Sequence, residues 1–329
     1  MAGAGAAAAQ PDHAVHVLGG ATMGTRWQAS VSAPRAADLH PLHDGIQACL
    51  DRVVAQMSTW EPDSDISRYN RAPPGTWQVL PRAFFDVLQE ALAIAEASQG
   101  ACDPTVGPLV EAWGFGPHGP GGRVPDAGQL AAARARVGWT RVVLDVAGQR
   151  ALQPGGVALD LSGIAKGHGV DAATAWLRAQ GVPAALVEVG GELRGYGRKP
   201  DGRAWAVLAE AWPQDDEDAA APPCILTLDD AAVATSGDHW HRFEHAGRAY
   251  SHTIDPRTGT PVEHAPAAVT VVAASALAAD AWATALTVLG ATRGHALAQA
   301  RGLAARFVTR TGDGVQVQAS DAFQERLAP

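Results

Sequence analysis

Residues 159–171, with the sequence LDLSGIAKGHGVD, constrain the fold of this chain more than any other stretch. An apolar run typical of a strand (156–161) ends in a Ser-Gly turn, and a segment with helical spacing follows. Asp160, Lys166 and Asp171 flank the turn. Backbone N–H groups at such a strand-to-helix turn favour anionic oxygens. Taken alone, an ordinary strand-to-helix connection with a surface lysine explains the stretch equally well.

The lysine in this turn is unusual for the chain. Of 25 Lys and Arg residues, only Lys166 and Lys199 are lysines, and a compact, flexible point charge suits a phosphate oxygen.

The formal net charge of −9 argues against nucleic acid as a partner. No apolar run approaches the roughly 18 residues of a membrane span. The three cysteines lack the spacing of a disulfide framework or a zinc site.

The rest of the pattern predicts the α+β class, with mostly antiparallel strands and interspersed helices. Strands are expected near residues 24–32, 141–146, 156–161, 184–189, 192–197, 204–210, 224–228, 248–254 and 267–273. Helices are expected over residues 39–57, from Pro81 to near Gly100, and over 167–180, 275–289 and 291–300, followed by a closing hairpin. An acidic loop spans 213–223. We expect a flexible lead (1–18), one large domain (19–320) and a short tail (321–329).

The predicted helix 275–289 contains a single charged residue, Asp280. Burying a carboxylate on a helix costs several kcal/mol of folding free energy unless a cation or a hydrogen-bond donor pairs with it. Thr284 lies four residues further on, so its hydroxyl shares a face with Asp280. A carboxylate and a hydroxyl form a partial set of ligands that Mg²⁺ completes with water and substrate phosphates. The alternative is a buried aspartate that bonds to an arginine or to the backbone.

Three further residues are candidates for chemistry or binding. His252 stands at the end of a predicted strand, where a histidine can serve as a general base or a pyrophosphate contact. Trp60 precedes a polar turn and either stacks on a planar ring or covers the core. Cys102 has no basic neighbour that would make it a nucleophile, so we interpret it as a small buried residue beside a polar turn.

With these stretches in order, the chain resembles the ApbE family, the FAD:protein FMN transferases, from about residue 20 to 310. The resemblance rests on Met23-Gly24-Thr25, MSTWEPDSDISRYN (57–70), DPTVGPLV with WGFGP (103–117), LDLSGIAKGHGVD, VEVGGELRGYG (187–197), ATSGD (234–238), SHTIDPRTGTPV (251–262) and ADAWATAL (279–286). It implies one ApbE-like domain of two intertwined halves, with the FAD site in a cleft between them. Trp60, Cys102 and His168 depart from the residues usual in the family.

The resemblance also implies the residues of the site. FAD would be contacted by Met23, Trp60, Ala101, Cys102, Asp103, Asp160, Lys166 and His252. Mg²⁺ would be held by the backbone carbonyl of Gly163 and the side chains of Asp280 and Thr284. This set joins the lysine turn and the lone helical aspartate, which the residues alone indicated separately. His252 takes the position of the family's catalytic histidine, and Lys166 would offset charge on the diphosphate.

The activity implied by the resemblance is Mg²⁺-dependent transfer of FMN from FAD to a Thr or Ser hydroxyl of an acceptor protein, with release of AMP. The acceptor would be a protein such as a subunit of a membrane redox complex. An FAD pyrophosphatase would use largely the same residues, and a non-catalytic FAD-binding protein is the third reading. The location usual for the family implies that this protein is periplasmic or on the envelope side, with the cytoplasm as the alternative.

Overall fold

The structure is a computed structural model, and it describes residues 12–119, 121–209, 224–237, 242–263, 266–311 and 314–327. The predicted acidic loop at 213–223 lies outside these residues.

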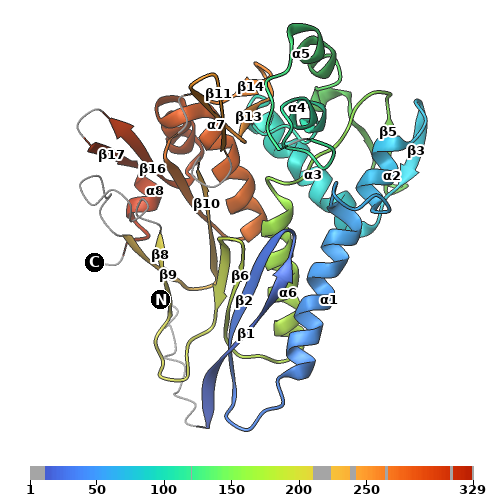
Figure 1. Cartoon of the computed structure of the whole chain (residues 1–329). Helices are drawn as coiled ribbons and strands as arrows, with labels where there is room; N and C mark the ends of the chain where they lie inside the picture. Colours follow the sequence, from blue (N-terminus) through green and yellow to red (C-terminus); the bar gives the residue numbers. More distant parts are fainter. Residues whose placement is uncertain are drawn as a thin grey trace.

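An eight-stranded antiparallel sheet forms the centre of the fold (Figure 1). Its order is β1-β2-β6-β7-β10-β15-β16-β17. The strands are β1 (His13–Thr22), β2 (Thr25–Pro34), β6 (Ala185–Val189), β7 (Glu192–Tyr196), β10 (Ala231–Gly237), β15 (Ala268–Ala273), β16 (Ala304–Thr311) and β17 (Gly314–Ala319). The predicted α+β class with mostly antiparallel strands is therefore confirmed.

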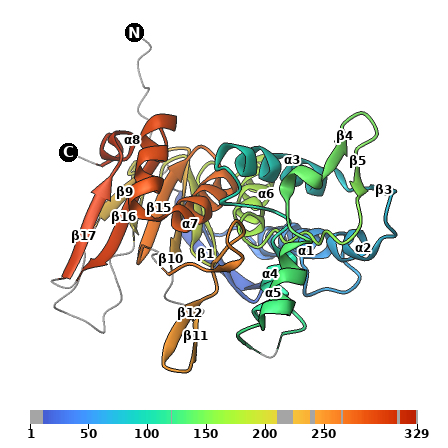
Figure 2. The same ribbon diagram turned by 90° about the horizontal axis from the view of Figure 1, so that it is seen from above.

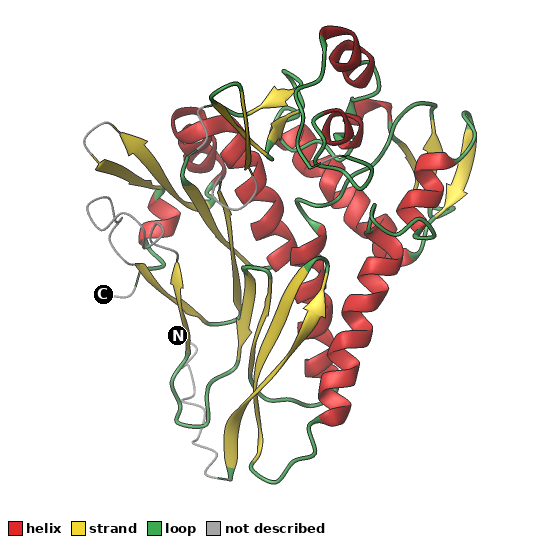
Figure 3. Cartoon of the chain, in the orientation of Figure 1, coloured by secondary structure: helices red, strands yellow, loops and turns green. Residues whose placement is uncertain are grey.

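Three long helices pack against this sheet, as the secondary-structure colouring in Figure 3 makes plain. They are α1 (His40–Met57), α6 (Ala165–Ala179) and α7 (Ala276–Arg301). Their apolar residues meet the sheet in two buried clusters, around Trp27 and Val187 and around Leu286 and Phe307. A separate apolar cluster joins the strands to the hairpin β8 (Trp205–Ala209) and β9 (Cys224–Leu228) and to α8 (Asp321–Gln324).

Two excursions of the chain from the sheet contain most of its remaining helices and strands. Between β2 and β6 it forms α1, α6 and a smaller lobe with α2 (Asp65–Arg71), α3 (Arg82–Ala97), α4 (Gly107–Ala112), α5 (Ala127–Arg134), the 3₁₀ turn η1 (Trp139–Arg141) and the sheet β3 (Thr76–Val79), β5 (Arg150–Gln153) and β4 (Val143–Asp145). Between β10 and β15 it forms β11 (Arg242–His245), β12 (Arg248–Ser251), β13 (Ile254–Asp255) and β14 (Thr260–Pro261).

The two excursions meet. Phe243 and Tyr250 from β11 and β12 pack against Leu109 of α4 and Trp113 directly after it. Figure 2 shows this hairpin beside α4 and α5. Segments far apart in the sequence are thereby interleaved around one sheet, as expected for two intertwined halves.

Several boundaries differ from the prediction. The predicted lead extends to residue 18, but His13–Thr22 form β1, in which Val15 and Val17 face solvent. The predicted tail begins at residue 321, but α8 starts there and buries Phe323 completely. By contrast, the break predicted between the helices 275–289 and 291–300 is confirmed, because α7 consists of two helical segments separated by a kink at the non-helical Gly290 (φ 74°, ψ 169°).

The strand predicted at 156–161 is wrong. This segment joins no sheet, because its backbone bonds to other partners. The Leu159 amide donates to the Asn70 side chain, and the Asp160 amide donates to the Pro104 carbonyl.

No helix among the described residues is long and apolar enough to cross a bilayer.

Candidate functional site

Helices α6 and α7 each supply a carboxylate to the first turn of the other. Asp171 of α6 accepts hydrogen bonds from the Ala276 and Leu277 amides at the start of α7 (3.0 and 2.9 Å). Asp280 Oδ2 of α7 accepts the Gly167 amide at the start of α6 (3.0 Å). The first four N–H groups of a helix lack intrahelical partners, and the helix dipole favours an anion there. This exchange locks the two helix starts together.

The exchange depends on Gly167. A Cβ at this position would lie 2.2 Å from the Ala276 carbonyl oxygen, so only glycine allows α6 to approach α7 this closely. The glycine-containing sequence after Lys166 is therefore explained by the helix contact that delivers Asp280 to the lysine turn.

Lys166 lies between two buried carboxylates. Its Nζ is 2.6 Å from Glu192 Oε1 and 3.8 Å from Asp280 Oδ1, and the carboxylate side chains are 5% and 3% exposed. With all three groups ionised, two carboxylates and one ammonium carry a formal charge of −1, which a bound proton or a further cation offsets; the Lys166 side chain is 30% exposed, so the cluster is open on the lysine side. A buried, uncompensated charge is costly, so the cluster is suited to a further cation.

Burial perturbs the titration of the cluster. Loss of hydration, and the nearby Asp280 charge, raise the pKa of Glu192, while the Lys166 ammonium opposes the rise. Burial also raises the pKa of Asp280, opposed first by the Lys166 charge and then by the Gly167 hydrogen bond. The pKa of Lys166 is raised because the two carboxylates outweigh its own desolvation. Perturbed groups that converge in this way are typical of functional sites.

Gly163 and Thr284 join Asp280 at this end of α6. A Cβ on Gly163 would lie 3.1 Å from Thr284 Oγ1, so glycine leaves the backbone close to this hydroxyl. Thr284 Oγ1 is also 3.4 Å from Ser236 Oγ on β10. Among the described residues, no group of three His, Cys, Asp or Glu side chains could hold a metal ion. The predicted set has one carboxylate, completed by a carbonyl and a hydroxyl.

Met23 reaches the same helix from the sheet. It forms the β1–β2 turn with Gly24 and adopts a positive φ of 48°, which is uncommon for a side chain of this size. Its Cε is 3.1 Å from where a Cβ would stand on Gly169 of α6. The strained turn therefore holds a flexible apolar side chain against the helix of the lysine turn.

The turn of Ala101, Cys102 and Asp103 approaches the cluster from the smaller lobe. The Asp280 charge contributes to the raised pKa of the Cys102 thiol, about 12, although burial and then Asp103 are the larger causes. Cys102 is half-buried and free, as expected for a residue without a nucleophilic role. Ala101 is 1% exposed.

The Asp103 carboxylate is engaged inside the protein. Oδ1 accepts hydrogen bonds from the Thr105 amide and hydroxyl (2.8 and 2.6 Å), and Oδ2 accepts the Trp139 amide (3.1 Å). Burial raises the pKa of Asp103 against these hydrogen bonds. The side chain therefore shapes the turn, and the backbone of the turn is left to contact a ligand.

The other predicted contacts are more exposed. Trp60 follows α1 and exposes 63% of its surface, as a stacking platform does. Asp160 is half-buried and accepts the Ser162 amide, which shapes the turn before α6. His252 follows β12 and lies edge-on to Phe115, with ring centroids 6.5 Å apart. Lys166, Asp280, Gly163 and Thr284 come together at the start of α6, whereas the ring contact of His252 is with Phe115, after α4.

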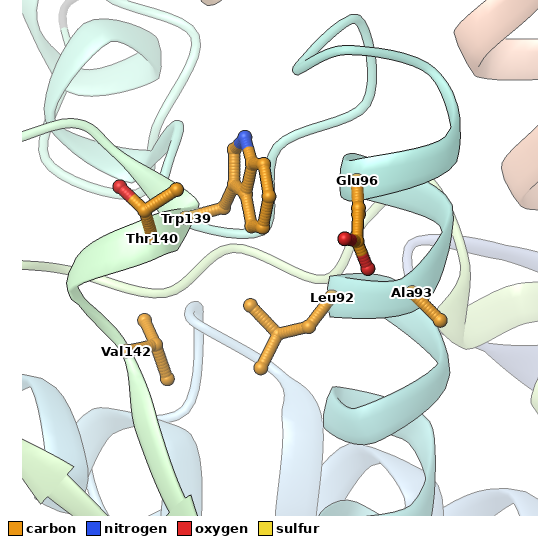
Figure 4. A pocket seen from close by; sticks show the side chains of 6 residues that line it. All are labelled: Leu92, Ala93, Glu96, Trp139, Thr140 and Val142. Atoms are coloured by element: carbon orange, nitrogen blue, oxygen red, sulfur yellow. The ribbon is translucent and has the colours of Figure 1, made fainter.

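Two open cavities of the described residues lie elsewhere. The first, about 450 Å³, is formed by α3 and η1, and Figure 4 shows Trp139 and Glu96 on opposite sides of it. The second, about 640 Å³, lies between α3, α6 and the start of α7 and is lined by His168 and Asp171. Neither is lined by Lys166 or Asp280. The second cavity has charged lining residues of its own, including Arg82, Asp86 and Glu90, but the buried ionisable groups that converge at Lys166 mark the candidate site.

Glu192 is the site residue that sequence reasoning missed. It begins β7 directly after the turn of Gly190 and Gly191, both at positive φ. The signal was present: in the hairpin VEVGGEL the residue belongs to the same alternation as the buried Val187 and Val189, so a charged residue stands where an apolar one is expected.

Comparisons with known proteins identify the family of the chain. The sequence model described as the ApbE family matches residues 23–307. A protein of Klebsiella pneumoniae (strain 342) named FAD:protein FMN transferase is 35% identical, with 97% of this chain and 91% of the relative covered. The protein of the same name from Vibrio cholerae (strain O395) is 37% identical, with 97% and 94% covered.

Solved structures give the same result. The apo form of the Pseudomonas stutzeri flavinyl transferase ApbE has a TM-score of 0.88 at 39% identity, with 96% of this chain and 97% of that chain covered. The flavin transferase ApbE from Vibrio cholerae has a TM-score of 0.87 at 35% identity, with 96% and 100% covered. The chain therefore belongs to the ApbE family of flavin transferases and is an enzyme of that class.

Proposed function

We propose that this enzyme transfers the FMN part of FAD to a Thr or Ser hydroxyl of an acceptor protein and releases AMP. The names of the relatives supply the coarse reaction, FMN transfer from FAD to protein. The observation that carries the proposal within this chain is the convergence of Lys166, Asp280, Gly163 and Thr284 at one end of α6. A mobile cation beside an oxygen ligand set is suited to a diphosphate.

The donor set fits Mg²⁺. A cation offsets the formal charge of −1 of the ionised cluster, and the ligands are all oxygen. Among the described residues, Asp280 Oδ1 accepts no hydrogen bond shorter than 3.5 Å, while Oδ2 is held by Gly167. The Gly163 carbonyl, the Asp280 carboxylate and the Thr284 hydroxyl would hold the ion. When bound, it would neutralise charge that builds up on the diphosphate.

The residues of the chain take distinct roles in the proposed reaction. Lys166 binds a diphosphate oxygen, and Trp60 and Met23 hold ring systems of FAD. His252 accepts the proton of the acceptor hydroxyl as its oxygen bonds to the FMN phosphorus. The bond from this phosphorus to the bridging oxygen breaks, and that oxygen leaves with AMP. Positioning and electrostatic stabilisation account for most of such a transfer.

The test is incubation of the protein with FAD, Mg²⁺ and a Thr-containing acceptor, followed by mass spectrometry. We expect the acceptor to gain the mass of FMN in proportion to the AMP released. Release of FMN and AMP with an unmodified acceptor would show an FAD pyrophosphatase instead. Tight FAD binding without AMP release would show a carrier. An envelope location stays a prediction that fractionation of cells would test.

A further inference from the structure

The Lys166 ammonium has two carboxylate neighbours at unequal distances. Glu192 Oε1 is 2.6 Å away, within hydrogen-bond range, whereas Asp280 Oδ1 is 3.8 Å away. The lysine stem lies along the β6–β7 turn, since its Cδ is 3.5 Å from where a Cβ would stand on Gly190. Lys166 is therefore hydrogen-bonded to Glu192 on β7, and Asp280 Oδ1 on α7 remains available to a ligand.

Glu192 is built to hold this position. It is 4% exposed and begins a strand that a two-glycine turn fixes in register opposite Val189. Among the described residues, its buried Oε2 has no hydrogen-bond partner, and Lys166 is the one side chain that donates a hydrogen bond to the carboxylate. A carboxylate buried at this cost without a structural bond network requires a reason beyond packing.

We infer that Glu192 is a positioning residue that sets the divalent-cation affinity of the site by keeping the Lys166 ammonium away from Asp280. Without Glu192, the ammonium has one buried carboxylate left and moves from its present distance of 3.8 Å to within hydrogen-bonding distance of it. A lysine paired with Asp280 competes with a divalent ion for the same oxygen. The inference rests on the proposed metal site and adds to it the residue that keeps its ligand accessible.

The test is a double-mutant cycle with Mn²⁺ as the probe, in which binding to the full-length protein is measured by electron paramagnetic resonance without FAD. The variants are Glu192→Gln, Lys166→Met and the two combined. Glu188→Gln, the same change on the neighbouring strand β6, is the matched control, and thermal unfolding checks that each variant folds. Asp280→Asn tests the metal site itself.

We expect Glu192→Gln to weaken Mn²⁺ binding about tenfold when Lys166 is present, the effect of one charge-assisted contact, and by less than about threefold in the Lys166→Met background. Glu188→Gln should leave binding within about twofold. An equal loss in both backgrounds would overturn the inference, because Glu192 would then act through its own charge. Unchanged binding in Glu192→Gln would overturn it as well.

The failures of the two proposals are distinguishable. If Asp280→Asn binds Mn²⁺ as the wild type does, the proposed metal site is wrong and the role of Glu192 is wrong with it. If Asp280→Asn loses binding while the Glu192→Gln effect is absent or independent of Lys166, the metal site stands and the positioning role alone is rejected. A fluorescence titration of FAD without metal would show whether either variant disturbs the rest of the site.

Discussion

Asp103 and Asp280 are both buried carboxylates of this chain, yet their surroundings differ. The two oxygens of Asp103 accept three hydrogen bonds from Thr105 and Trp139. Asp280 accepts one, from the Gly167 amide, and its other oxygen faces the Lys166 ammonium at 3.8 Å. Burial raises the pKa of both. A buried carboxylate whose bonds are complete maintains the fold, and one with an open oxygen is available for a ligand.

The largest expected effect is on the activity of Asp280→Asn. The change keeps the shape of the side chain and its bond to Gly167 but removes the charge, so flavin transfer should fall about a thousandfold. The free energy of unfolding should change little or increase, because an uncompensated charge leaves the interior. Transfer assays and urea unfolding measure the two quantities. Activity near that of the wild type would contradict the proposal that Asp280, unlike Asp103, binds a ligand.

His252→Ala should lower transfer by about a hundredfold to ten-thousandfold, the usual contribution of a general base. Mn²⁺ binding should stay at the wild-type value, because His252 is not one of the proposed cation ligands. His245→Ala, an exposed histidine in the same hairpin region, is the control and should retain activity. Equal losses in the two variants would remove the catalytic assignment of His252.

Asp103→Asn should show the opposite pattern to Asp280→Asn. An amide oxygen replaces one carboxylate oxygen, but the amide nitrogen then faces a donor, either the Trp139 amide or the Thr105 amide and hydroxyl. We expect a loss of about 2 kcal/mol in the free energy of unfolding, because a buried donor is left unsatisfied. Transfer by the folded fraction should stay within severalfold. A stable variant with abolished transfer would place the Asp103 side chain in the site.

The metal-free protein should lose stability as the pH rises. Burial raises the pKa of Glu192 above its ordinary value of 4.5, so the folded state binds this proton more tightly than the unfolded state. The stability from this group is present below pH 4.5 and is lost as the pH rises through the raised pKa. Thermal midpoints between pH 4.5 and 8 should therefore fall less in Glu192→Gln. Parallel pH profiles in the two proteins would argue against a buried, protonated Glu192.

The smallest effect is expected at the exposed aromatic. Trp60→Ala should raise the KM for FAD about fivefold with little change in kcat, because a stacking contact contributes about 1 kcal/mol. Stability should be unaffected, since Trp60 is 63% exposed. Trp77→Ala, a partly exposed tryptophan on β3, is the matched control. A similar rise in KM for the control would indicate a general effect of removing a surface tryptophan.

Helices and strands could be predicted where their own residues show a clear helical or alternating hydrophobic pattern. The span of α1 and the strands β6 and β7 agree with the prediction. The prediction failed where hydrogen bonds to residues distant in the sequence determine the local structure. The segment 156–161 alternates like a strand, yet the Asn70 side chain and the Pro104 carbonyl take its backbone bonds. Strand β1 was missed because its valines face solvent at the sheet edge.

The same limit applies to the site. A lone charge in an apolar helix was enough to single out Asp280, and the rarity of lysine was enough for Lys166. The reciprocal exchange between Asp171 and Asp280 was not predictable, because it depends on how closely Gly167 lets the two helices approach. Glu192 became visible as a site residue only when β7 was placed beside α6 and α7.

The central claim is that the open oxygen of Asp280 binds a divalent ion together with Gly163 and Thr284. The most direct test is a crystal grown with Mn²⁺ and FAD, with anomalous scattering recorded at the manganese edge. We predict one strong peak between the Gly163 carbonyl, the Asp280 carboxylate and the Thr284 hydroxyl, beside the FAD diphosphate. A peak elsewhere with none at these three groups, or Lys166 paired directly with Asp280 in the metal-loaded crystal, would contradict the account.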